Sequence, residues 1–97
     1  MTQDYPPATG TIMIDNDRVR VTEWRFGPGQ ATGHHRHEMD YVVVPITTGR
    51  LKILDKDGAE SYAGLVEGEP YYRPAGVEHD VINDDDREIA FIEIEIR

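Results

Sequence analysis

The sequence predicts an all-β fold, a barrel or sandwich of two packed antiparallel sheets. Short runs rich in Val, Ile, Thr and aromatic residues are separated by clusters of Asp, Asn and Gly, which is the pattern of strands joined by turns. The turn signals recur about every eight to twelve residues, as in sandwiches and barrels. No segment has a convincing helical period. These observations together predict an architecture without helices.

The expected strands follow from the turns between them. Asp15–Asp17 is a turn of residues that hydrogen-bond locally, so the runs on either side of it form a hairpin. Gly27–Gly29 interrupts the next ladder, because Pro28 has no backbone donor. Residues 83–86 join the last two runs. We expect strands at residues 11–14, 19–26, 31–37, 40–46, 50–54, 60–63, 71–73, 78–82 and 88–97.

The final run has the clearest strand period. Ile92, Ile94 and Ile96 alternate with Glu93, Glu95 and Arg97, which predicts a strand with one buried face.

Length and the amino-terminal composition define the domain. At 97 residues there is room for one domain only. Residues 1–10 are polar and proline-rich, so we expect an N-terminal arm there and a single folded domain over residues 11–97. We also expect a homodimer. A barrel this short leaves edge strands open, and the N-terminal arm of one chain can cover or pair with an edge strand of a second chain.

Charge and composition exclude several classes of function. Nineteen acidic and ten basic residues give a formal net charge of -9, which repels nucleic acid and anionic membranes. There is no cysteine, so neither disulfides nor thiolate metal sites are possible. The longest apolar stretch, residues 41–46, is too short to span a bilayer, and residues 1–10 do not resemble a signal peptide. We therefore expect a cytoplasmic protein.

Three of the four histidines lie together in the sequence, at positions 34, 35 and 37. Because side chains alternate along a strand, His35 and His37 point to one face and His34 to the other. Such a pair can hold a metal ion if a third ligand joins it, and His79 is the remaining imidazole. The alternative is that these are exposed loop residues or core histidines satisfied by hydrogen bonds.

A sixteen-residue segment carries a longer motif. Gly68, Pro74, Gly76, His79 and Asn83 match G-x5-P-x-G-x2-H-x3-N at every fixed position. This is the second motif of the cupins, and the chain resembles the RmlC-like cupin superfamily.

The first cupin motif, G-x5-H-x-H-x3-E followed by a glycine, is similar to the segment from Gly29 through His35 and His37 to Gly49. The chain departs from it at Tyr41, which stands where the family has a glutamate ligand, and Gly49 lies one residue later than in the pattern. The resemblance implies a cupin double-stranded β-helix, a jelly-roll-like barrel. It also implies one divalent metal ion, Fe, Ni, Mn or Zn, held in the mouth of the barrel by His35, His37 and His79.

Tyr41 shares the strand parity of His35 and His37, so it is expected to face the same cavity. A neutral phenol is a poor metal ligand near neutral pH, and we assign Tyr41 the catalytic role of a hydrogen-bond donor to substrate or of an occasional fourth ligand. In an alternative arrangement, a β-bulge after His37 turns Asp40 inward and gives a site of three histidines and one carboxylate.

The resemblance leaves several functions open. The first is a metal-dependent enzyme, dioxygenase-like or else a lyase or isomerase, acting on a small polar or carboxylated metabolite. The second is a non-catalytic cupin that binds or senses a small molecule. The third is a structural barrel with idle histidines. Segments 22–26 and 35–45 are also similar to small bacterial cupins labelled β-alanine degradation proteins.

Overall fold

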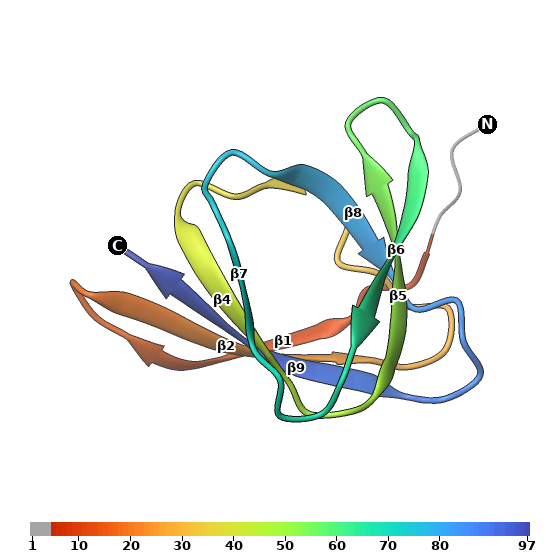
Figure 1. Cartoon of the computed structure of the whole chain (residues 1–97), viewed down its shortest axis with the longest axis horizontal. Coiled ribbons are helices and arrows are strands. Elements are labelled where there is room, and N and C mark those ends of the chain that lie inside the picture. Colours follow the sequence, from red (N-terminus) through yellow and green to blue (C-terminus); the bar gives the residue numbers. More distant parts are fainter. Residues whose placement is uncertain (1–4) are drawn as a thin grey trace.

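Nine strands make up the fold in the computed structural model, which describes residues 5–97 (Figure 1). Each lies within or overlaps an expected run, and the largest difference is at residues 31–37. In chain order they are β1 (Thr9–Asp15), β2 (Val19–Phe26), β3 (His35–Arg36), β4 (Asp40–Pro45), β5 (Gly49–Asp55), β6 (Glu60–Leu65), β7 (Tyr71–Arg73), β8 (Glu78–Ile82) and β9 (Ile89–Ile96).

The strands form two antiparallel sheets that face each other. One sheet has five strands in the order β1-β2-β9-β4-β7, and the other has four in the order β3-β8-β5-β6. Figure 1 shows the five-stranded sheet along the bottom and side of an open barrel, with β8, β5 and β6 opposite it. The all-β prediction is confirmed, and the described residues contain no helix that could cross a membrane.

The core fills the end of the barrel where the two sheets come together. Phe26, Leu51 and Ile89 are no more than 2% exposed and belong to one apolar cluster. Gly49 is needed at this point, since an added Cβ would lie 2.5 Å from Cδ1 of Ile89. The packing closes one end of the barrel and leaves the other end for a cavity.

The expected strand at residues 31–37 is broken. Only His35–Arg36 is regular strand, while Ala31 forms isolated bridges to Pro7 and Ile82. Gly33 has a φ of +87°, a left-handed conformation that interrupts an extended ladder. The first four residues of the expected N-terminal arm lie outside the described residues, and β1 begins at Thr9, before the expected domain boundary.

The last strand has its glutamate side inward. Glu95 is only 6% exposed, whereas Ile96 is 46% exposed, and Glu93 lines the interior cavity. The alternation predicted from the sequence is present, but the interior side carries Phe91, Glu93 and Glu95. Strand β9 lies between β2 and β4, so both of its edges are hydrogen-bonded within the sheet.

Candidate metal centre

Strands β3 and β8 bring the two motifs together. They pair antiparallel with His35 directly opposite His79. His37 follows β3 and is held against the turn that precedes β8, because its amide donates to the Val77 carbonyl and its own carbonyl accepts from the Gly76 amide. Gly76 has a φ of +98°, so this turn requires a glycine.

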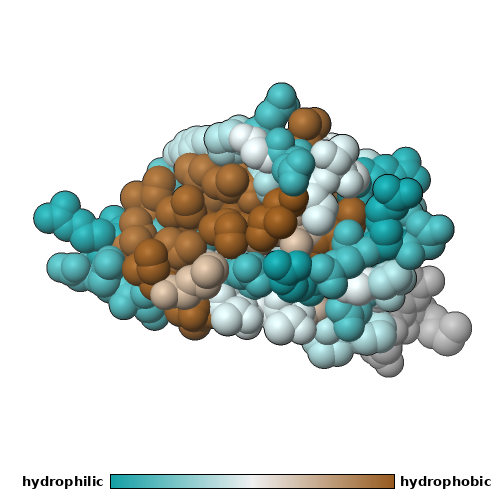
Figure 2. Space-filling view, turned by 90° about the horizontal axis from the view of Figure 1, so that it is seen from below, coloured by the Kyte–Doolittle hydropathy of each residue, from teal (hydrophilic) through white to brown (hydrophobic). Residues whose placement is uncertain are grey.

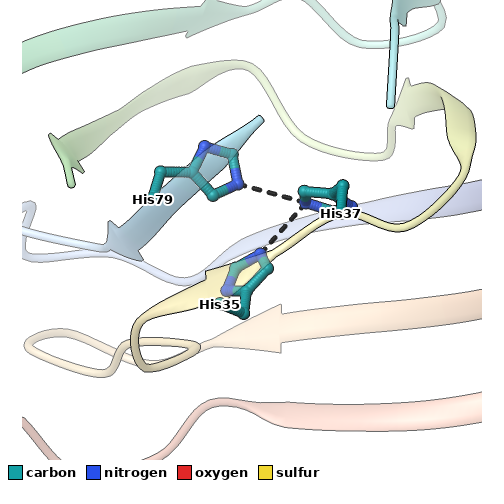
Figure 3. A group of neighbouring side chains, drawn as sticks. All are labelled: His35, His37 and His79. Atoms are coloured by element: carbon teal, nitrogen blue, oxygen red, sulfur yellow. Dashed lines mark hydrogen bonds between the residues drawn. The ribbon is translucent and has the colours of Figure 1, made fainter. Parts of the chain in front are cut away.

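The three imidazoles converge on one point (Figure 3). Nε2 of His37 lies 3.0 Å from Nε2 of His35 and 3.2 Å from Nε2 of His79. Nitrogen ligands about 2.0–2.1 Å from a tetrahedral ion are about 3.3–3.4 Å apart, so this spacing fits one ion shared by three histidines. The prediction that these residues are neighbours is confirmed.

The hydrogen bonds of His35 fix which of its nitrogens has a lone pair. Its Nδ1 lies 2.8 Å from the Gly33 carbonyl oxygen, which can only accept, so Nδ1 carries a proton and the neutral ring has its lone pair on Nε2. An imidazole nitrogen has a single proton or a single lone pair, and Nε2 of His37 therefore cannot form two well-directed hydrogen bonds at once. A shared cation satisfies all three nitrogens together, so the residues fit a metal ion.

Burial keeps two of these rings unprotonated. Burial, followed by the nearby His35, lowers the pKa of His37 to about 4 and that of His79 to about 3. A neutral imidazole is the form that coordinates a metal. The site is therefore ready to bind at neutral pH without first losing protons from these two rings.

His34 lies outside the cluster, as the strand alternation predicts. Its ring is exposed and Nε2 lies 2.9 Å from a carboxylate oxygen of Glu78. Asn83, the last residue of the second motif, is fully buried and its Nδ2 donates to the carbonyls of Phe26 and Arg87. It stabilises the connection between β8 and β9.

Tyr41 lies against His37 inside the cavity. The two rings are stacked, with centroids 3.9 Å apart, and Tyr41 is 4% exposed. Burial raises the pKa of Tyr41 to about 12, so the phenol stays protonated near neutral pH. Within residues 5–97 its hydroxyl has no hydrogen-bond partner, which leaves a donor available to a bound molecule.

The Asp40 carboxylate forms its hydrogen bonds outside the histidine cluster. This carboxylate accepts hydrogen bonds from the Ala75 amide at 2.7 Å and from the Tyr72 hydroxyl at 2.8 Å, and both lower the pKa of Asp40. Among the described residues, those that line the cavity do not include Asp40. The β-bulge arrangement with Asp40 turned inward is therefore not the one adopted.

The cavity has a volume of about 550 Å³ and contains charged residues that the sequence did not indicate. Glu95 is buried and paired with Arg20, whose Nε and Nη2 donate to its carboxylate at 2.8 and 3.1 Å. Glu93 lies beside this pair, and burial together with the charge of Glu95 raises its pKa to about 7. Ligand atoms of His37, Glu93 and Glu95 lie within 4.8 Å of one another, so the acids are close to the histidines.

These acids were missed because the last strand alternates evenly between apolar and charged residues. Phe91 shares the parity of Glu93 and Glu95, but isoleucine is at least as typical of a protein interior as phenylalanine, so the local pattern does not identify the inward face. Of the two adjacent tyrosines in β7, Tyr71 lines the cavity and Tyr72 is 50% exposed.

Comparisons with known proteins identify the family of the chain. No protein-family model matches the chain. It is 52% identical over 92 residues to the β-alanine degradation protein BauB of Pseudomonas aeruginosa, covering 95% of this chain and 96% of that protein. A crystal structure of a cupin domain from Bordetella pertussis is 54% identical, covers 99% of both chains and superposes with a TM-score of 0.92. The chain belongs to the cupin superfamily.

More distant cupins support the fold alone. An RmlC-like cupin with a double-stranded β-helix fold from Methanocaldococcus jannaschii is 14% identical, with a TM-score of 0.76 over 99% of this chain and 85% of that one. The cupin fold predicted from the two motifs is therefore confirmed.

Proposed function

We propose that this cupin binds one divalent metal ion through His35, His37 and His79 and uses it to act on a small carboxylated metabolite. The observation that carries the proposal is the convergence of three Nε2 atoms, with separations of 3.0 and 3.2 Å around His37, at the wall of a cavity. The bound ion supplies positive charge and open coordination positions, which attract an anionic or chelating molecule.

The residues that line the cavity are the chain's own contribution to binding the metabolite. The Tyr41 hydroxyl donates a hydrogen bond to the bound molecule, while its ring holds the His37 imidazole in place by stacking. Arg20 holds Glu95 by two hydrogen bonds, which fixes the acidic side of the cavity beside His37. Apolar walls from both sheets, among them Val43, Leu51 and Phe91, limit the entry of water.

A role in β-alanine degradation is part of the proposal. It is supported by the name of the Pseudomonas aeruginosa relative, which aligns with almost the whole chain. Metabolites of this pathway are expected to be small and to carry a carboxylate, and a metal beside a neutral Tyr41 is suited to such a group. Dioxygenase-like, lyase and isomerase reactions are the candidate chemistries, and ligand binding without turnover is the alternative function.

Metal analysis of the protein after removal of any affinity tag tests the site. We expect about one ion per chain in the parent and a loss of most of it in His79→Ala, since two imidazoles bind more weakly than three. His34→Ala is the matched control, because His34 pairs with Glu78 outside the cluster. A His79→Ala protein that retains the full metal content would overturn the proposal.

A second experiment separates an enzyme from a binding protein. The protein is loaded with ferrous iron and given β-alanine and three-carbon carboxylates related to it, with oxygen uptake and product formation measured against free iron. Turnover above that control supports the enzyme. Saturable binding of a carboxylate without turnover supports the non-catalytic role instead.

A further inference from the structure

Glu93 lies on the inner face of the five-stranded sheet, in the wall of the cavity. The register of β9 places it opposite Thr22 on β2 and opposite Val43 on β4, and both of these residues also line the cavity. The outer face of the same sheet is a largely hydrophobic surface (Figure 2). Glu93 is therefore a charged side chain that points towards the interior of the barrel.

The charges in the cavity are not balanced. Five residues with charged side chains line it, namely Arg20, Arg36, Glu38, Glu93 and Glu95. Arg20 donates two hydrogen bonds to Glu95, at 2.8 and 3.1 Å, and Nη1 of Arg36 lies 3.4 Å from Oε1 of Glu38. Within residues 5–97 the Glu93 carboxylate forms no hydrogen bond and no ion pair. The uncompensated charge of the cavity wall is therefore the carboxylate of Glu93.

Two buried hydroxyls in the same wall also lack a partner. Thr22, directly opposite Glu93, is 7% exposed, and Tyr41 is 4% exposed. Among the described residues, neither hydroxyl forms a hydrogen bond. The same residues contain no unpartnered side-chain oxygen that is sealed from solvent, so both hydroxyls are open to the cavity. Buried polar groups normally have hydrogen-bond partners, which a bound molecule can supply here.

We propose that Glu93 and Thr22 bind the ammonium group of a zwitterionic substrate, a small amino acid whose carboxylate is held by the metal ion. An ammonium group has three N–H donors and no acceptor, whereas the oxygens of Glu93 and Thr22 can accept. Its positive charge compensates the carboxylate in a half-buried position. The inference rests on the proposed function for the carboxylate end of the substrate, because the metal ion attracts that group.

His37 limits the distance between the two ends of the substrate. Its Nε2 belongs to the cluster of three imidazoles, and one of its ring nitrogens lies within 4.8 Å of a Glu93 oxygen. The carboxylate and the ammonium group are therefore bound near the same ring. A molecule with only a few atoms between its charged groups can reach both positions, and Val43 and Phe91 offer apolar contacts to those atoms.

A second metal ion is a less suitable occupant of this position. Ligand atoms of His37, Glu93 and Glu95 are close enough to share one. The Glu95 carboxylate, however, already accepts two hydrogen bonds from Arg20, so a metal ion bound to it would lie beside the guanidinium charge. An ammonium group needs only Glu93 and Thr22, and neither of them has another partner among the described residues.

Calorimetry with three molecules of similar size tests the proposal on the full chain loaded with Zn²⁺. Propanoate has only the carboxylate, propylamine has only the ammonium group, and β-alanine has both. Burial raises the pKa of Glu93 to about 7, so this carboxylate is ionised in a titration at pH 8. We expect β-alanine to bind at least about tenfold more tightly than propanoate, since hydrogen bonds between charged groups are strong.

Three variants separate Glu93 from the rest of the cavity. Glu93→Gln removes the charge with little change of shape and is expected to reduce the preference for β-alanine to about onefold. Thr22→Val should weaken β-alanine binding by about fivefold and leave propanoate binding unchanged. Glu38→Gln is the matched control, because Glu38 also lines the cavity but is paired with Arg36, and it should keep the full preference. Circular dichroism verifies that each variant is folded.

The outcomes distinguish this inference from the proposed metal function. Equal binding of propanoate and β-alanine by the parent would overturn the inference and leave the metal function intact, and so would a preference that persists in Glu93→Gln. Binding of propylamine to metal-free protein, lost in Glu93→Gln, would support the inference even if His79→Ala contradicted the metal site. A parent that binds neither β-alanine nor propylamine would overturn it. A second metal ion per chain that is lost in Glu93→Gln would do the same.

Discussion

The ring of Tyr41 stacks on the imidazole of His37 with a centroid distance of 3.9 Å and an angle of 18° between the planes. This contact places a protonated phenol beside the three clustered imidazoles. Tyr41→Phe retains the stack and removes only the hydroxyl. We therefore expect unchanged metal content and weaker binding or slower turnover of the carboxylate, measured by calorimetry and steady-state kinetics. A loss of the metal would instead identify Tyr41 as a ligand.

The Arg20 and Glu95 pair is expected to matter for stability. Glu95 is 6% exposed, so Arg20→Met leaves a buried carboxylate without its partner. We expect a loss of about 2 kcal/mol in the free energy of unfolding, measured by urea denaturation. The double variant Arg20→Met with Glu95→Met should recover part of this loss. Arg25→Met, which breaks an exposed pair, is the control and should cost less.

Glu93 is expected to make stability fall as pH rises. Its pKa is raised to about 7 in the folded protein from an ordinary value of 4.5, so the folded state binds the proton more tightly. The stabilising contribution is complete below pH 4.5 and is lost as pH rises through 7. Glu93→Gln should therefore stabilise metal-free protein at pH 8, by at most about 3 kcal/mol, and have little effect at pH 4.

The buried histidines make stability depend on pH in the opposite direction from Glu93. The pKa values of His37 and His79 are lowered to about 4 and about 3, so the unfolded chain binds protons more tightly below pH 6.5. Stability should fall as pH decreases from 6.5 towards 3. Thermal unfolding of metal-free Glu93→Gln, in which the opposing carboxyl is absent, is the measurement. A flat profile between pH 6 and pH 4 would contradict the assigned burial of these rings.

Gly49 is expected to tolerate no side chain. A Cβ at this position would lie 2.5 Å from Cδ1 of Ile89, which is fully buried, so the two groups could separate only by repacking the core. Gly49→Ala should cost about 1–3 kcal/mol, the usual effect of overpacking. Adding Ile89→Val removes the conflicting methyl group and should recover most of the stability, as measured by urea denaturation. Gly64→Ala, where the added Cβ meets nothing within 4 Å, is the control.

Strand parity and motif spacing predicted most of the site. Alternation alone separated His34 from His35, and the second motif located His79 on a neighbouring strand, which pairs directly with His35. The acidic side of the cavity was not predicted. In an evenly alternating strand, local pattern shows that two faces exist, and only tertiary packing decides which face is interior.

Alternate residues of strand β9 therefore determine two different properties of the protein, the chemistry of the cavity and the character of the outer surface. Substitutions at Glu93 or Glu95 alter the chemistry of the cavity, and substitutions at Ile92 or Ile94 alter the opposite surface. Evolution can tune one property without disturbing the other, provided that the register is kept. A slip by one residue would exchange the two sets of side chains, so a single insertion or deletion in this strand would damage both properties at once.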